Sequence, residues 1–203
     1  MTGARWGILG GTFDPPHYRH LAIADQVRES LGLAGVMFMP AAQPPHKGGQ
    51  LVSRGTDRLL MTRLAITGDS AFELCPIEME RPGPSYTIDS VDELERSSAG
   101  AKLYLLMAAD SLNAIETWRE PDRLLERIEW VVGPRPGSEL PDRSALEERF
   151  GELASRIHLL SGPSLDVSSS EIRRRVAAGQ AIRYLVPRGV EELIVDRGLY
   201  RRG

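Results

Sequence analysis

The sequence predicts an α/β fold in which helices cover both faces of a doubly wound parallel sheet. Short apolar runs alternate with helical segments at intervals of roughly twenty to thirty residues, as in parallel strands joined by helical crossovers. The runs at residues 5–9 and 36–40 are almost wholly apolar, as expected of strands buried on both faces. Two helical segments follow the last run. We therefore expect a single domain over residues 1–203, with a Rossmann-like core over about 1–162 and a small helical C-terminal extension over about 163–203.

Each element has its own signal in the sequence. The first strand ends in Gly-Gly, and a helix follows it over residues 20–32. The apolar residues of this helix fall on one face: Ile23, Val27 and Leu31. Gly32 suits the end of the helix because glycine readily adopts the left-handed conformation found there. The remaining expected elements are a strand over 36–40, a helix capped by Thr56, a strand over 72–79, a helix over 87–97, a strand over 102–108, a helix over 121–127, strands over 128–133 and 156–160, and helices over 168–179 and 188–198.

Composition limits the classes of partner and compartment. The formal net charge is −3, so no overall positive field favours nucleic acid. No segment approaches the roughly 20 apolar residues that a membrane span needs, and the N-terminus lacks a signal-peptide pattern. The single cysteine, Cys75, permits no intramolecular disulfide and fits a buried apolar residue better than a reactive thiol. We expect a cytoplasmic protein with no membrane or nucleic-acid partner. The sequence leaves a homo-oligomer open.

The segment GGTFDPPHYRH, residues 10–20, lies where the first strand meets its helix, which is the ligand crevice of open parallel sheets. Gly10 and Gly11 let backbone approach a ligand closely, and the N–H groups of the helix N-terminus favour phosphate. His17 and His20 are three residues apart and share a face of the first turn. Imidazoles in a dry crevice can donate hydrogen bonds to phosphate oxygens.

Phosphate contact by the two histidines is not the only interpretation of this segment. The segment lacks the lysine of a P-loop and the third glycine of a dinucleotide fingerprint. A His-x-x-His pair can bind zinc, but no third ligand stands in convincing sequence context, so we expect no protein-bound metal. A purely structural pair is the remaining alternative.

A cationic second half of the site is expected from DVSSSEIRRR, residues 166–175. Ser168 and Glu171 have the spacing of a capping box, so a helix begins here and presents N–H groups to an anion. Ser170 and Arg173 lie three apart and can both hold phosphates. The alternative is a solvated basic face, which fits one or two of the three consecutive arginines because they cannot share one helix face.

Three further stretches end near the same crevice. Lys47 follows the second strand and can reach phosphate. Thr87 opens a helix whose N–H groups can bind a small anion such as a carboxylate. Asp110 can accept ribose hydroxyls and Trp118 can stack on a flat ring, although a helix cap and core packing are equally simple explanations of the two.

These motifs resemble those of the nucleotidyltransferases related to class I aminoacyl-tRNA synthetases, whose signature is Gly-Gly-Thr-Phe-Asp-Pro-x-His-x-Gly-His. The order of the motifs and the ending YLVPRGVEELIVDRGLY are similar to bacterial nicotinate-nucleotide adenylyltransferases, and the likeness runs over nearly the whole chain. The resemblance implies AMP transfer from ATP, with Mg²⁺ assisting, to nicotinate mononucleotide. The products are deamido-NAD and pyrophosphate, in NAD biosynthesis.

The resemblance also implies residue roles. The phosphate region is expected to comprise Gly10, Gly11, Thr12, Phe13, His17 and His20, and the triphosphate clamp Lys47, Ser170 and Arg173. The pyridine pocket is expected to comprise Thr87, Trp118 and the backbone of Arg119, with Asp110 on a ribose. Of these, His17, His20, Lys47 and Arg173 are the expected catalytic residues.

Arg19 departs from the family pattern, which has glycine there. In a regular helix Arg19 lies about 200° around the axis from His17, so its side chain can point away from the nucleotide. Two alternatives stay open. One is a related transferase that uses nicotinamide mononucleotide or phosphopantetheine. The other is a nucleotide-binding regulator without catalysis, in which Arg19 blocks the approach.

Overall fold

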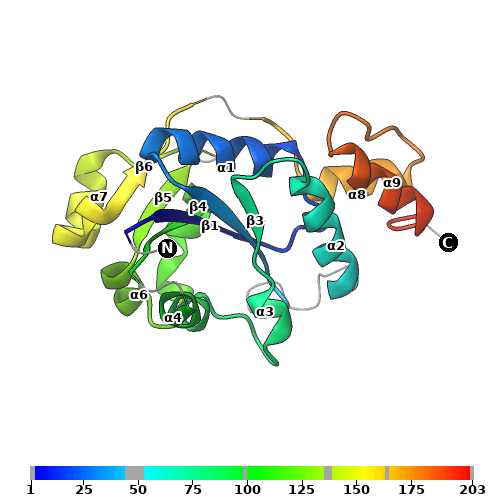
Figure 1. Ribbon diagram of the computed structural model, residues 1–203. Helices are drawn as coiled ribbons and strands as arrows, with labels where there is room; N and C mark the ends of the chain where they lie inside the picture. Colours follow the sequence, from blue (N-terminus) through cyan, green and yellow to red (C-terminus); the bar gives the residue numbers. More distant parts are fainter. Residues whose placement is uncertain (1–2, 44–52, 98–99, 135–138, 163–164, 202–203) are drawn as a thin grey trace.

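A computed structural model describes residues 3–43, 53–97, 100–134, 139–162 and 165–201 (Figure 1). Within these residues, six parallel strands form one sheet in the order β3-β2-β1-β4-β5-β6. The strands are β1 (Arg5–Gly11), β2 (Gly35–Pro40), β3 (Phe72–Leu74), β4 (Lys102–Ala108), β5 (Glu129–Gly133) and β6 (Ile157–Leu159). The chain runs outward from β1 to β3 and then returns to place β4 on the other side of β1. This order confirms the doubly wound fold and puts the topological switch point between β1 and β4.

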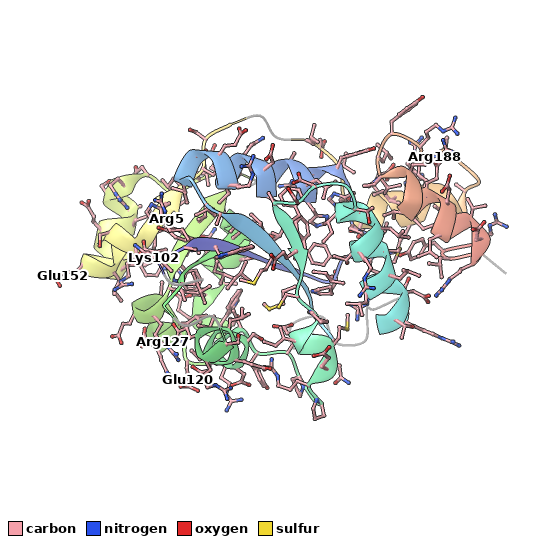
Figure 2. The ribbon with its side chains drawn as sticks, in the orientation of Figure 1. Arg5, Lys102, Glu120, Arg127, Glu152 and Arg188 are labelled. Carbon is pink, nitrogen blue, oxygen red and sulfur yellow. The ribbon has the colours of Figure 1, made fainter. Side chains whose placement is uncertain are left out.

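Alternate residues of the strands enter two separate cores. On β1, Trp6 and Ile8 face one layer and Leu9 faces the other. The layer under Ile8 is covered by α4 (Thr87–Ser97) and α6 (Pro121–Arg127), whereas α1 (Tyr18–Leu31) covers the opposite face (Figure 1). Charged side chains lie on the outside, as Arg5, Glu152 and Arg188 do in Figure 2. Burial on both faces therefore explains the apolar strand sequences.

The C-terminal helices form a third cluster beside the sheet. Helices α8 (Ser169–Ala177) and α9 (Arg188–Asp196) pack against α2 (Gly55–Ile66), which lies between them and the strands (Figure 1). Ile172, Val190 and Ile194 are almost fully buried against Met61 of α2. This packing brings the N-terminus of α8 to the end of β1 from which the first loop emerges.

Two sequence expectations about elements are wrong. The strand expected over 72–79 ends at Leu74, because Pro76 offers no N–H to a ladder and its carbonyl accepts instead from the Met79 N–H at 2.7 Å, opening α3 (Ile77–Glu80). Thr56 does not cap α2. That helix begins at Gly55, after Arg54 as N-cap.

Several short elements were not predicted from the sequence. They are α5 (Ala109–Asn113), the 3₁₀ turns η2 (Ile115–Thr117) and η3 (Gly151–Arg156), and α7 (Arg143–Phe150). In α7 only Leu146 is buried, so the helix leaves no apolar periodicity in the sequence. The first helix, in contrast, ends as expected, with Gly32 in the left-handed region at φ 57°. Among the described residues, no helix is both long and apolar enough to cross a membrane.

Candidate functional site

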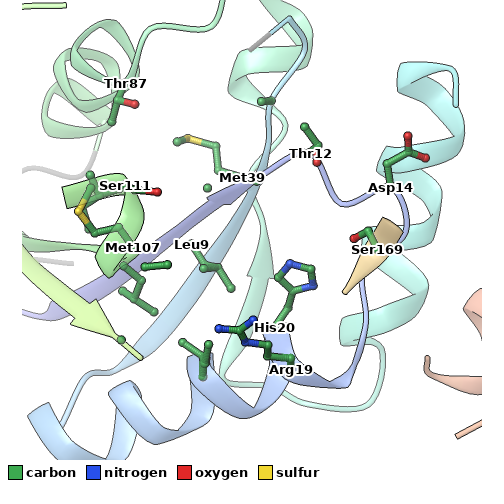
Figure 3. A pocket seen from close by; sticks show the side chains of 18 of the residues that line it. Leu9, Thr12, Asp14, Arg19, His20, Met39, Thr87, Met107, Ser111 and Ser169 are labelled. Atoms are coloured by element: carbon green, nitrogen blue, oxygen red, sulfur yellow. The ribbon is translucent and has the colours of Figure 1, made fainter. Parts of the chain in front are cut away.

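A cavity of about 470 Å³ opens at the carboxyl end of the sheet, beside the switch point between β1 and β4 (Figure 3). This volume lies within the range of small-molecule sites. The residues expected from the sequence that line it are Gly10, Gly11, Thr12, His17, His20, Thr87, Trp118, Arg119, Ser170 and Arg173. They come from β1, the β1–α1 loop, α1, α4, the segment after η2 and α8, so the fold gathers motifs that lie far apart along the chain.

The β1–α1 loop has the geometry that close approach of a ligand requires. A Cβ atom at Gly10 would meet nothing within 4 Å, so the space above this residue is open. Phe13 adopts a left-handed backbone conformation with φ 48°, which is strained for a non-glycine residue. Its ring is buried, with its edge against His20 at a centroid distance of 5.0 Å. Phe13 therefore supports His20 from beneath and does not itself line the cavity.

The two histidines form a stacked pair at the start of α1. Their ring centroids lie 3.8 Å apart, and the His17 backbone N–H donates to Nδ1 of His20 at 3.2 Å. That bond occupies Nδ1 of His20 as an acceptor, so a neutral ring carries its proton on Nε2. The ring of His20 projects into the cavity (Figure 3). The pair can therefore present a fixed N–H donor to a phosphate oxygen.

His17 is neutral at physiological pH. Burial, aided by the positive charge of Arg19, lowers the pKa of His17 from 6.5 to about 4. A neutral imidazole donates one hydrogen bond and accepts one, so His17 contributes to the site as a polar donor and not as a cation.

The depressed pKa of His17 predicts a loss of stability in mild acid. The unfolded chain takes up a proton near pH 6.5 and the folded chain only near pH 4, so the free energy of unfolding falls as the pH drops between these values. The expected loss is about 3 kcal/mol, measured by urea denaturation across pH 4 to 7. In His17→Gln the free energy of unfolding should fall by about 3 kcal/mol less between pH 7 and pH 4. An unchanged pH dependence would contradict the lowered pKa of His17. Arg19→Gln should raise the pKa of His17 in an NMR titration.

Arg19 does not point away from the site, contrary to the expectation from a regular helix. Its Nη2 donates to the Pro134 carbonyl at 2.9 Å, just beyond β5, and both residues line the cavity. The helical rotation fails here because α1 begins at Tyr18, while His17 is the N-cap with an extended backbone at φ −149°. Arg19 thus spans the crevice from α1 toward β5.

Helix α8 supplies the expected second half of the site. The Ser168 hydroxyl accepts from the Glu171 N–H at 3.2 Å and caps the helix, as predicted. Arg173 donates from Nη1 to the Asp14 carbonyl at 2.7 Å and from Nη2 to the Ser170 hydroxyl at 3.2 Å. Arg174, in contrast, pairs with Glu171 at 2.7 Å on an exposed face. Of these two arginines, only Arg173 belongs to the cavity.

A mixed polar and aromatic wall closes the other end of the cavity. Thr87 is the first residue of α4, where backbone N–H groups lack partners within the helix. Trp118 lines the cavity and also packs on Trp130, with a centroid distance of 6.3 Å. The guanidinium of Arg119 lies 4.9 Å from the Tyr86 ring centre. The wall can hold a planar ring that carries a small anionic group.

Asp110, like Phe13, is an expected residue that does not line the cavity. Asp110 is exposed in α5, where its carboxylate accepts from the Ser111 N–H at 3.1 Å, and Ser111 rather than Asp110 lines the cavity. Lys47 lies outside the described residues.

Sequence reasoning missed the buried groups that hold the β1–α1 loop. Arg58 of α2 is 1% exposed and donates to the carbonyls of Thr12, Ala41 and Ala42 at 2.9, 2.6 and 3.2 Å. Asp14, inside the first motif, is equally enclosed at 2% exposure. Asp14 could have been found from the sequence, because it is part of the GGTFDPPHYRH segment. Arg58 could not, because a single arginine in a helix normally faces solvent.

Residues 8–175 match the family model described as cytidylyltransferase-like. A probable nicotinate-nucleotide adenylyltransferase of Thermomicrobium roseum is 44% identical over 98% of this chain and 92% of the relative. One of Roseiflexus sp. is 45% identical over 99% of this chain and 100% of the relative. The solved Plasmodium falciparum nicotinic acid mononucleotide adenylyltransferase complexed with NaAD superposes with a TM-score of 0.80 at 20% identity, covering 97% of each chain.

Proposed function

The chain belongs to the cytidylyltransferase-like family, among the nicotinate-nucleotide adenylyltransferases, and on this premise we propose that it transfers AMP from ATP to nicotinate mononucleotide. The products are pyrophosphate and deamido-NAD, in a step of NAD synthesis. The observation that supports this assignment most is the meeting of His20 with Ser170 and Arg173 in one cavity, opposite a wall suited to a carboxylated ring.

In the proposed reaction, a 5′-phosphate oxygen of nicotinate mononucleotide attacks the α-phosphorus of ATP. The new O–P bond forms as the bond to pyrophosphate breaks, and pyrophosphate leaves with the bonding electrons. A phosphate monoester is already ionised near neutral pH, so the step needs no strong general base. His20 donates to the α-phosphate, while Ser170, Arg173 and the N-terminus of α8 hold the leaving phosphates. Catalysis is then orientation plus charge stabilisation.

We propose Mg²⁺ as the ion that accompanies ATP. Among the described residues, no group of three or more His, Cys, Asp or Glu side chains converges as a metal cage. In nucleotide sites Mg²⁺ is usually bound by substrate phosphate oxygens, by several waters and by one or two carboxylates. When bound, the ion neutralises charge on the triphosphate.

An acceptor comparison tests the proposed function. Purified protein with ATP and Mg²⁺ is given nicotinate mononucleotide, nicotinamide mononucleotide or phosphopantetheine, and pyrophosphate and the dinucleotide product are measured. We expect the highest kcat/KM with nicotinate mononucleotide, because the N–H groups near Thr87 and Arg119 favour a carboxylate. Equal or higher values with either other acceptor would overturn the preference.

The regulator alternative rests on one observation, the reach of Arg19 across the cavity to Pro134. A nucleotide-binding regulator would bind ATP without releasing pyrophosphate in the presence of any of the three acceptors. The same assay therefore separates the two functions.

We also infer that the chain works as a single domain in a reducing compartment, the cytoplasm. Cys75 is buried, and burial raises the pKa of its thiol to about 11, so it behaves as an apolar core residue.

A further inference from the structure

The C-terminal segment reaches the β1–α1 loop through a partly buried hydrogen bond. The hydroxyl of Tyr200 donates to Oδ1 of Asp14 at 2.6 Å, across 186 positions of sequence. Oδ2 of the same carboxylate accepts from the Ser53 N–H at 3.3 Å. Asp14 lies at the edge of the cavity, where its carboxylate contacts the C-terminal segment through Tyr200 (Figure 3).

Asp14 links this bond to the cationic half of the site. Its backbone carbonyl is the acceptor for Nη1 of Arg173, the guanidinium expected to hold the leaving phosphates. Two nearby carbonyls of the loop also accept hydrogen bonds: Arg58 donates to Thr12 O at 2.9 Å, and the Ser169 hydroxyl donates to Pro15 O at 2.8 Å. A shift of the Asp14 side chain would therefore move the carbonyl that orients Arg173.

Several contacts of the segment after α9 place the Tyr200 hydroxyl beside the Asp14 carboxylate. Arg197, just after α9, forms an ion pair with the buried Asp57 of α2, which anchors the segment. Gly198 and Tyr200 then adopt left-handed backbone conformations, with φ 61° and 63°. For tyrosine this conformation is unfavourable and persists only where surrounding contacts enforce it. One such contact is the Met61 sulfur, 3.8 Å from the Tyr200 oxygen.

The hydroxyl is a permanent donor. Burial, together with the Asp14 carboxylate, raises the pKa of Tyr200 far above its usual range. The Tyr200 hydroxyl therefore keeps its proton, and remains a donor to Asp14, at neutral pH.

We propose that Tyr200 is a positioning residue for adenylyl transfer. It acts through Asp14, whose carbonyl aims Arg173 at the triphosphate, so the C-terminal segment completes the ATP half of the site without touching substrate. The inference rests on the proposed function for its substrate. The contact that orients Arg173, its hydrogen bond to the Asp14 carbonyl, is seen in the structure and does not depend on which substrate binds.

The decisive variant is Tyr200→Phe, which removes one oxygen and keeps the ring. We expect kcat to fall about 10- to 100-fold and the Kd for ATP to rise, because the arginine is misdirected, while KM for nicotinate mononucleotide stays within about twofold. The matched control is Tyr184→Phe, because Tyr184 is 85% exposed and lies outside the cavity. Circular dichroism verifies that each variant is folded at the assay temperature.

Wild-type kcat and ATP affinity in folded Tyr200→Phe would overturn the proposal, as would equal losses toward both substrates. Asp14→Asn gives an independent arm, with the same kcat fall expected, and it decides the matter if Tyr200→Phe does not fold. Where both fold, the Tyr200→Phe loss should shrink in an Asp14→Asn background, and additive losses would contradict action through Asp14. Calorimetric measurement of ATP binding needs no acceptor. It therefore tests the hydrogen bonds from Tyr200 through Asp14 to Arg173 even if the wild-type protein does not turn over nicotinate mononucleotide.

Discussion

His20→Ala is expected to lower kcat for adenylyl transfer about 100- to 1,000-fold while leaving the fold intact. In the proposed mechanism the variant removes the donor to the phosphate whose charge develops in the transition state, and losses of this size follow the removal of one such donor. The geometry is specific, because the bond from the His17 N–H to Nδ1 leaves Nε2 of His20 as the donor. Steady-state kinetics with both substrates saturating would measure the effect.

The control for His20→Ala is His158→Ala. His158 is half-buried on β6 and bonds to Glu129 at 2.8 Å, outside the cavity residues. We expect its kcat to stay within about twofold of wild type, since the side chain is absent from the site. Near-normal turnover in folded His20→Ala would remove His20 from the mechanism.

Arg58→Met is expected to lower the free energy of unfolding by about 3 to 5 kcal/mol. Methionine keeps much of the side-chain volume but leaves three partly buried carbonyls, those of Thr12, Ala41 and Ala42, without the donors that now satisfy them. Burial lowers the pKa of Arg58 while the nearby Asp14 charge raises it, and an arginine with this many acceptors stays charged. Urea denaturation followed by circular dichroism would give the difference.

Arg63→Met is the matched control for this second substitution. Arg63 lies on the same helix with an exposed side chain, and changes at such positions usually alter stability by less than about 0.5 kcal/mol. If Arg58→Met came within 1 kcal/mol of Arg63→Met, the three carbonyl contacts would not be the support inferred for the β1–α1 loop.

The fold, and the two segments that meet in the cavity at the end of β1 and the start of α8, could be predicted from the sequence because they depend on local patterns. Apolar runs gave the parallel strands, and the Ser168–Glu171 spacing gave the start of α8. What could not be predicted depends on contacts between distant residues. Arg58 belongs to no pattern in its own segment. Tyr200 ends the family-like segment YLVPRGVEELIVDRGLY, but nothing in that segment indicates its partner, so both residues are explained only by contacts with the β1–α1 loop.

Arg19 shows how a local rule fails at an element boundary. The expected rotation around the helix axis assumed helical backbone from His17 onward, whereas the helix begins one residue later. The direction of a side chain near an N-cap is thus set by the extended cap residue, and by a distant acceptor such as Pro134, more than by helical period.

The carbonyls of Thr12, Asp14 and Pro15 are all taken by donors from α2 and α8. The three carbonyl oxygens therefore point toward these donors and not toward the cavity. An anion that bound a flexible loop would first have to reorient its peptide dipoles, whereas folding has already oriented them here. A triphosphate entering this crevice would meet peptide dipoles already aligned, so its binding energy remains available to orient the reacting atoms.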